Sequence, residues 1–269
     1  MVIIKINYKP SKITNKLINI ICKNILNSPL KNKYNKKTKN RKYTLKEIIT
    51  KIMYVLEKGH VWRSLDSCYN NVYKNFIFLT KNNVFTYTYK ELLNKYLKKH
   101  KMLRKIISVD TSFILNKYGI DKIKRNKYVK NKNCNKIFVA IDKNNEPIFF
   151  DYCEGNINDC KILFKNINNI PFSNIKNTFL LGDKGFCSNI IRETLKNMNV
   201  VPIIPTNKRN SKTEINILTD KQKQIYKKRI KIEHLFSLLK KNIRFNLRYE
   251  KYILNLYSFT HIYFSKLLI

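Results

Sequence analysis

Acidic residues are scarce in this 269-residue chain. It has 17 Asp and Glu against 55 Lys and Arg, which gives a formal net charge of +38. No acidic tail offsets this charge, so self-repulsion is large unless a polyanion is bound. A membrane surface is the rival polyanion, but the basic residues are spread along the chain rather than gathered on one amphipathic helix. The balance therefore predicts nucleic acid as the partner.

The chain also lacks paired cysteines and long apolar runs. Its six cysteines include no C-x-x-C pair and no Cys/His cluster with zinc-site spacing, which argues against structural zinc. Without a cleavable signal sequence, we expect an intracellular protein with reduced thiols. The most apolar region, Ile253–Ile269, is interrupted by polar residues and is too short to cross a bilayer. We expect it to be a packed helix, with no membrane association.

The first third of the sequence shows no alternating strand pattern. Short helices separated by polar breaks are expected at residues 11–26, 44–58, 68–80 and 88–103. Gly59 fits a helix C-cap, and the only tryptophan, Trp62, is expected to pack in the core. Residues 31–42 are almost wholly Lys, Asn, Arg and Thr, which indicates either a solvated loop or a phosphate-contacting segment. Residues 1–103 are thus predicted to form a small all-α N-terminal domain with a basic loop.

From residue 104 the pattern changes to short apolar runs bounded by turns. Strands are expected at residues 105–113, 136–141, 147–152, 178–181 and 200–204, with residues 142–146 closing a hairpin. Helices are expected at residues 158–169, 188–198, 219–246 and 251–268. The order predicts an α/β domain over residues 104–269, with a mixed five-stranded sheet flanked by helices.

Four polar residues form a stripe on the predicted helix near the C-terminus. Residues 221–243 read as one uninterrupted amphipathic helix, in which Tyr226, Arg229, Glu233 and Lys240 are spaced 3, 4 and 7 apart. At about 100° per residue, these side chains fall within a stripe roughly 60° wide, beside an apolar face. They could therefore act at one site, where the Glu233 carboxylate suits metal binding.

Two further acids follow apolar runs. Asp110 ends the run Ile106–Val109, and Asp183 follows Phe179–Gly182 and precedes Lys184. An acid on a central strand is costly without a partner, and ligand sites in such sheets lie beyond strand ends. Together with Glu233 they would supply three hard oxygen ligands for one or two Mg²⁺ ions. Two such ions would activate a hydroxyl and stabilise a leaving oxygen at a phosphodiester.

These residues resemble a known family, the DDE transposases of bacterial-type insertion sequences in the broad IS4/IS5 group. The family's helix signature, Tyr-x₂-Arg-x₃-Glu-x₆-Lys, is matched by Tyr226, Arg229, Glu233 and Lys240. The segments 108–112 and 181–186 resemble its two Asp motifs, and Gly59-x-x-Trp62-Arg63-x-Leu65 is similar to a pattern in its N-terminal domain. Only 50 residues separate Asp183 from Glu233, so the large β-rich insertion of some relatives is absent.

The resemblance implies an RNase H-like fold for the catalytic domain and a DNA-binding role for the N-terminal domain. It implies that Asp110, Asp183 and Glu233 are catalytic and hold Mg²⁺ or Mn²⁺, with two ions expected. It also implies that Tyr226, Arg229, Lys240 and Lys184 contact DNA. Asp159 is expected to favour the start of a helix by its charge, and an orienting role near the acids stays open.

The function implied is that of a DNA transposase, a metal-dependent endonuclease and strand transferase. It would cleave at the ends of its element and transfer the 3′-ends to target DNA. Its partners would be double-stranded DNA, as terminal inverted repeats and target, and a second copy of the chain when two ends are joined. The alternatives are a catalytically silent DNA-binding relic and a stand-alone nuclease. The protein is expected wherever the element's DNA resides, in the cytoplasm of a prokaryote or for a cytoplasmic virus, or in a eukaryotic nucleus.

Overall fold

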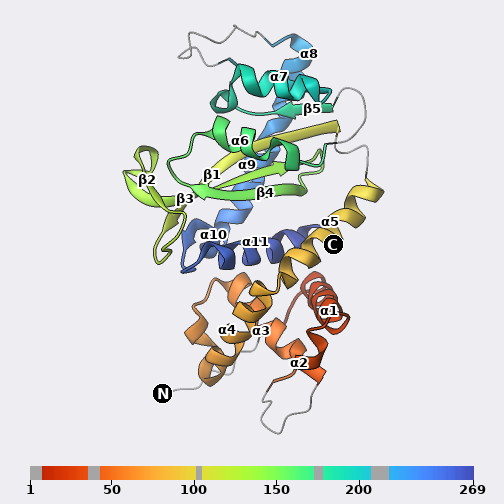
Figure 1. The fold of residues 1–269 in the computed structure, drawn as a ribbon, viewed down its shortest axis with the longest axis vertical. Helices are drawn as coiled ribbons and strands as arrows, with labels where there is room; N and C mark the ends of the chain where they lie inside the picture. The colour runs from red at the N-terminus through yellow and green to blue at the C-terminus, as the bar shows by residue number, and fades with distance from the viewer. Residues whose placement is uncertain (1–7, 36–42, 101–104, 173–177, 207–217) are drawn as a thin grey trace. The chain divides into compact units, whose positions relative to one another are not determined.

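The structure, a computed structural model, describes residues 8–35, 43–100, 105–172, 178–206 and 218–269 (Figure 1). The chain divides into two compact units. Unit 1 comprises Met1–Tyr96, Asn242–Arg244 and Tyr252–Ile269, and unit 2 comprises Leu97–Lys241 and Phe245–Lys251. The expectation of two contiguous domains, 1–103 and 104–269, differs from this division. The difference arises because the last helix makes its contacts within unit 1.

Unit 1 is built from helices. They are α1 (Lys12–Leu26), α2 (Lys31–Asn35), α3 (Leu45–Lys58), the 3₁₀ helix η1 (Trp62–Cys68), α4 (Tyr69–Lys81), most of α5 (Val84–Lys99) and α11 (Ile253–Leu267). Local sequence sets several ends. Ser11 caps α1 by accepting from the Thr14 amide, and Thr44 forms a capping box with Glu47 at the start of α3. Gly59, predicted as a C-cap, has φ +67°, a left-handed conformation that favours glycine.

Aromatic rings fill part of the core of unit 1. Phe76 lies 4.7 Å from Phe259 of α11 and 5.0 Å from Trp62, measured between ring centroids. Trp62, predicted as a core residue, is partly buried and packs against the buried rings of Phe76 and Phe259. The predicted basic loop at 31–42 is wrong in its first five residues, which form α2; residues 36–42 lie outside the described residues.

Unit 2 contains one mixed sheet of seven strands within its described residues. The strands are β1 (Ile106–Asn116), β2 (Lys124–Asn126), β3 (Lys132–Ile141), β4 (Pro147–Glu154), β5 (Thr178–Leu181), β6 (Val200–Ile203) and β7 (Leu247–Arg248). The order β2-β3-β1-β5-β6 has β3 antiparallel to β1, and β5 and β6 parallel to it; β4 pairs antiparallel with β3. This confirms the predicted α/β class with a mixed sheet flanked by helices.

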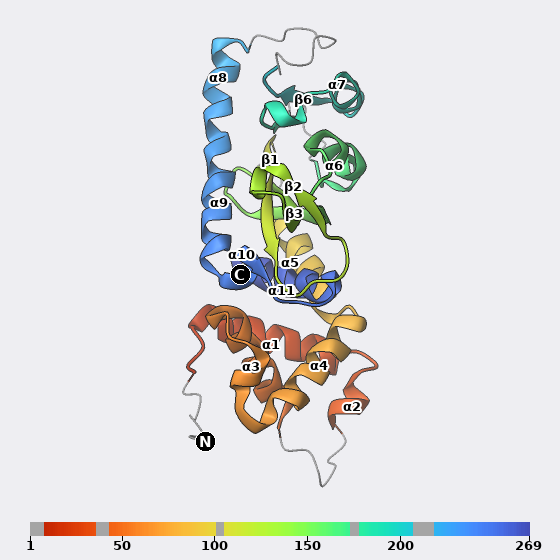
Figure 2. The ribbon, with the colours of Figure 1, turned by 90° about the vertical axis from the view of Figure 1, so that its left-hand side faces the viewer.

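Helices cover both faces of this sheet (Figure 2). On one face lie α8 (Asp220–Tyr226) and α9 (Ile230–Lys241), and on the other α6 (Asp159–Asn166) and α7 (Asn189–Asn197). The β3–β4 hairpin turns where predicted, since Asp142 Oδ1 accepts from the amides of Asn144 and Glu146. The remaining short elements are η3 (Lys127–Val129), η4 (Ile167–Asn169), η5 (Lys184–Phe186), η6 (Lys227–Arg229) and α10 (Ile243–Asn246).

Two features of unit 2 differ from the sequence prediction. The five predicted strands are present, but β2 and β7 add two short ones. The helix predicted as uninterrupted over 221–243 is broken by the 3₁₀ turn η6 between α8 and α9, and it ends at Lys241. Its predicted apolar face is buried at Ile232, Leu235, Phe236 and Leu239. None of the described helices combines the length and hydrophobicity that a bilayer crossing requires.

Candidate active site

Asp110 lies within β1, on the central strand between β3 and β5. Its Cα is opposite Val139 of β3. Its carboxylate accepts a hydrogen bond from the Thr111 amide at 2.7 Å, and its side chain is 19% exposed. Burial raises the pKa of Asp110 to about 6, although the Thr111 amide and Arg229 oppose this; the charge of Asp183 raises it further. Because burial destabilises the charged form of this carboxylate, a nearby cation stabilises it.

Asp183 follows β5, the parallel neighbour of β1. It is the N-cap of η5, and its Oδ1 accepts from the Gly185 amide at 2.8 Å. A Cβ atom at Gly185 would lie only 2.8 Å from that oxygen, so glycine lets the turn close around the carboxylate. Because the charge of Asp183 acts on Asp110, the structure brings these two predicted residues into one electrostatic site.

Arg229 joins Asp110 to Glu233. One guanidinium nitrogen donates to Asp110 Oδ2 at 3.0 Å, and the other donates to Glu233 Oε1 at 2.5 Å. Burial alone would lower the pKa of Arg229, but Asp110, Tyr226 and Glu233 raise it overall. The guanidinium thus acts as a built-in counter-ion between an acid on β1 and an acid on α9.

The other predicted residues differ in how closely they approach the acids. Tyr226 lies beside Arg229, whose guanidinium carbon is 5.9 Å from the ring centroid, and burial raises the pKa of this tyrosine. Lys240 is exposed in the last turn of α9, and Lys184 is exposed in η5. The structure therefore brings together Tyr226, Arg229 and the three acids, while no described contact joins the two lysines to them.

The fit of these residues to a divalent cation has two sides. Carboxylate oxygens are the ligands that Mg²⁺ prefers, and burial with a neighbouring negative charge at Asp110 favours a cation. Among the described residues, however, no three Asp, Glu, His or Cys side chains lie close enough together to hold a metal ion. Glu233 is instead paired with Arg229. The three carboxylates are thus of the right chemical type for a divalent cation. Glu233 and Asp110, however, are joined through the Arg229 guanidinium rather than lying next to each other.

A second carboxylate network adjoins the site. Asp159, at the start of α6, accepts from Thr111 Oγ1 and from Lys136 Nζ, each at 2.9 Å. The sequence prediction did not single out Lys136. The available signal was a lysine that directly precedes the apolar run Ile137–Ile141 of a central strand.

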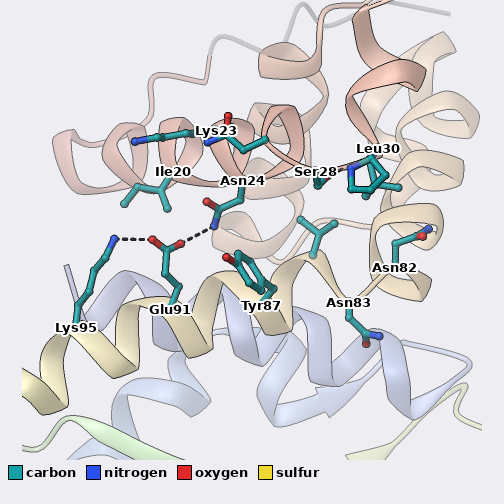
Figure 3. Close-up of a pocket in the computed structure, with 13 residues that line it drawn as sticks. Ile20, Lys23, Asn24, Ser28, Leu30, Asn82, Asn83, Tyr87, Glu91 and Lys95 are labelled. Atoms are coloured by element: carbon teal, nitrogen blue, oxygen red, sulfur yellow. Dashed lines mark hydrogen bonds and ion pairs between the residues drawn. The ribbon is translucent and has the colours of Figure 1, made fainter.

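A pocket of about 660 Å³ lies in unit 1, between α1 and α5 (Figure 3). Its one acid, Glu91, accepts from Asn24 Nδ2 at 2.9 Å and from Lys95 Nζ at 2.5 Å, and these bonds, that from Lys95 first, lower its pKa. None of the seven predicted site residues lines it. This pocket is therefore distinct from the candidate active site formed by Asp110, Asp183 and Glu233.

Comparisons with known proteins identify the second part of the chain. Residues 101–256 match the family model for the transposase DDE domain. Among solved structures, the catalytic domain of Mos1 mariner transposase aligns over 68% of this chain and 87% of that chain, at 11% identity and a TM-score of 0.29. The Mos1 transposase paired-end complex with left transposon end aligns over 96% and 78%, at 12% identity and a TM-score of 0.27. No curated protein matches. Because both TM-scores are below 0.5, the family assignment rests on the family model.

Proposed function

The chain belongs to the family of transposase DDE domains, and from this premise we propose that it binds the ends of its own mobile element, cleaves the DNA backbone there and transfers the 3′-ends to target DNA. One observation carries the proposal. Arg229 links Asp110 of β1 to Glu233 of α9, and Asp183 acts electrostatically on Asp110. Three acids from distant parts of the sequence thus belong to one charge network.

Asp110, Asp183 and Glu233 are the residues that would hold Mg²⁺ or Mn²⁺ ions, with two expected. When bound, such ions activate a water or a DNA 3′-hydroxyl and stabilise the leaving oxygen. The protein's own contribution is to present carboxylates on a rigid strand, a tight turn and a helix, which keeps their spacing fixed. Asp183 is held by the Gly185 amide and Asp110 by the Thr111 amide.

Double-stranded DNA is the proposed substrate, both as element ends and as target. Arg229 and Tyr226 would contact a phosphate and a base beside the acids, because a guanidinium pairs with phosphate and a phenol ring stacks or donates. Exposed Lys184 and Lys240 would neutralise neighbouring phosphates. Two copies of the chain would act together, since two element ends must be cut in one reaction.

The test is a cleavage assay on a plasmid that carries the native locus with its flanking DNA. Purified protein is incubated with Mg²⁺ or Mn²⁺, and the wild type is compared with Glu233→Gln. The matched control is Glu193→Gln, an exposed glutamate on α7 that no described contact joins to the site. Breaks that map to the element's ends, persist in the control and disappear in Glu233→Gln are expected. Equal cleavage by Glu233→Gln would refute the proposal.

The second candidate is a DNA-binding relic that no longer cuts. It is favoured by the pairing of Glu233 with Arg229 and by the lack, among the described side chains, of a three-ligand group. Binding at the element's ends without breaks by any variant would support it. Breaks without joining to target DNA would instead indicate a nuclease.

A further inference from the structure

Lys136 is the one lysine that the described part of the chain buries. It lies on β3 and is 6% exposed. Its Nζ donates to Asp159 Oδ1 at 2.9 Å and to the Ile157 carbonyl at 2.8 Å, and lies 5.1 Å from the centroid of the Phe113 ring. Burial of an ammonium group is unfavourable unless it is paired and hydrogen-bonded. In a chain whose other described lysines are less buried, this placement requires a specific explanation.

The pair lies on the face of the sheet opposite to Asp110. Adjacent residues of a strand point to opposite faces, so Thr111 points away from the face of Asp110. Lys136 is opposite Phe113, two residues beyond Thr111, and therefore shares the face of Thr111. Asp159 accepts from Thr111 Oγ1 at 2.9 Å. The ion pair thus contacts Thr111, the residue next to Asp110, from the opposite face of the sheet.

The same helix start also contacts the turn that carries Asp183. A Cβ atom at Gly185 would lie 3.3 Å from Asp159 Oδ2 and 2.8 Å from Asp183 Oδ1, so the backbone of Gly185 runs close to both carboxylates. Cys160 Sγ donates to the Gly185 carbonyl at 3.1 Å. The start of α6 is therefore fastened to β1 through Thr111 and to the turn at Gly185.

We propose that the Lys136–Asp159 pair is a positioning device that fixes the turn carrying Asp183 relative to the strand carrying Asp110. The inference rests on the proposed function for its chemical purpose. Neither residue needs to touch DNA, since both act through the backbone and through Thr111. Groups that orient the ligands of a metal commonly change metal affinity or activity by about 10- to 100-fold when removed.

The test compares two single variants with the double variant. Asp159→Asn leaves the buried Lys136 without a counter-charge, and Lys136→Met leaves Asp159 without its cation, so both single variants are expected to lose stability. The double variant removes both charges and is expected to recover stability. If the pair positions the acids, cleavage by the double variant nevertheless stays about 10- to 100-fold below wild type.

Hydrogen exchange supplies a readout that needs neither metal nor DNA. The Gly185 amide donates to Asp183 Oδ1, so the peptide spanning residues 183–187 reports directly on the turn. Faster exchange there is expected in the double variant. Thr111→Val provides a second route, because it removes only the hydroxyl that reaches Asp159 and keeps both charges; slower cleavage is expected from it too.

The matched control is Lys165→Met. Lys165 is on α6, the helix that begins with Asp159, and pairs with Asp151 at 3.1 Å, but its side chain is 67% exposed. The Lys165→Met variant is expected to leave cleavage and the exchange of residues 183–187 unchanged. Wild-type exchange of those residues in both the double variant and Thr111→Val would overturn the positioning role, whatever the cleavage rate. If the wild type cuts no DNA, the proposed function fails, while the exchange comparison still decides the role of the pair.

Discussion

His261 makes the stability of unit 1 depend on pH. It lies on α11 and is 9% exposed, with its ring centroid 5.3 Å from that of Tyr89 and 6.3 Å from that of Tyr257. Its Nδ1 is 3.4 Å from Thr86 Oγ1. Burial, followed by the charge of Lys90, lowers the pKa of His261 to about 3. The folded unit therefore holds this imidazole in its neutral form.

The size of the effect follows from the two pKa values of this group. In the unfolded chain a histidine has a pKa of about 6.5. Because the folded pKa is lower, the contribution of His261 to stability is complete above about pH 6.5 and is lost as the pH falls toward 3. At pH 5 the loss is about 1.5 pH units at about 1.4 kcal/mol each, or about 2 kcal/mol. This figure depends on the unfolded value alone while the folded pKa stays well below 5.

The assay is urea unfolding at pH 7 and pH 5, followed by tryptophan fluorescence. Trp62 is the only tryptophan and belongs to unit 1, so its signal reports on that unit. Wild type is compared with His261→Phe, which keeps a ring between the tyrosines but cannot take up a proton. Other groups shift in the opposite sense, such as Glu146 in unit 2, whose pKa burial and then Asp142 raise to about 7. The difference between the two proteins therefore isolates His261.

The free energy of unfolding of wild type is expected to fall from pH 7 to pH 5 by about 2 kcal/mol more than that of His261→Phe. The same pH dependence in both proteins would refute the reasoning. It would mean that the imidazole is solvated in the folded unit, or that a partner stabilises its charged form.

Three further outcomes are expected. Arg248→Met should destabilise unit 2 by about 3–5 kcal/mol in chemical denaturation, because Arg248 is fully buried and donates to the carboxylate and carbonyl of Asp121. Arg248→Lys should not restore stability, since lysine lacks the planar, multiply donating guanidinium group of arginine. Gly155→Ala should cost about 1–3 kcal/mol in thermal unfolding, because its Cβ would lie 2.2 Å from Cys134 Sγ. Lys240→Ala should reduce the slope of log affinity against log salt by about 0.9 in a DNA titration, the change for one lost phosphate contact; an unchanged slope would remove Lys240 from the interface.

Local sequence was sufficient for much of the fold. Strand β5, the turn at 142–146 and the C-cap at Gly59 were predicted because each depends on a few adjacent side chains. The starts of α1 and α3 were placed one residue early, at Ser11 and Thr44, which the structure shows to be N-caps. The short strands β2 and β7 were not, because each exists through pairing with a distant strand. β7, for instance, consists of two residues that pair with Leu115 and Asn116 of β1.

The same distinction holds for the site. The i, i+4 spacing of Arg229 and Glu233 allows their ion pair to be predicted from helix geometry. The contact of Arg229 with Asp110 spans 119 positions, and that of Lys136 with Asp159 spans 23, so neither follows from spacing. The roles of Asp110, Asp183 and Glu233 in catalysis stay predictions until the cleavage assay is done.

The division of the chain into units affects when unit 1 can fold during synthesis. Unit 1 begins at the first residues but includes Tyr252–Ile269, and Phe259 of that segment stacks with Phe76. At about 5–20 residues per second, translation from residue 97 to residue 252 takes on the order of 10 to 30 s. During this interval the early helices lack α11, so Phe76 and Trp62 lack the contact with Phe259 that they make in the folded unit. We therefore expect unit 1 to complete its packing only after most of unit 2 has been synthesised.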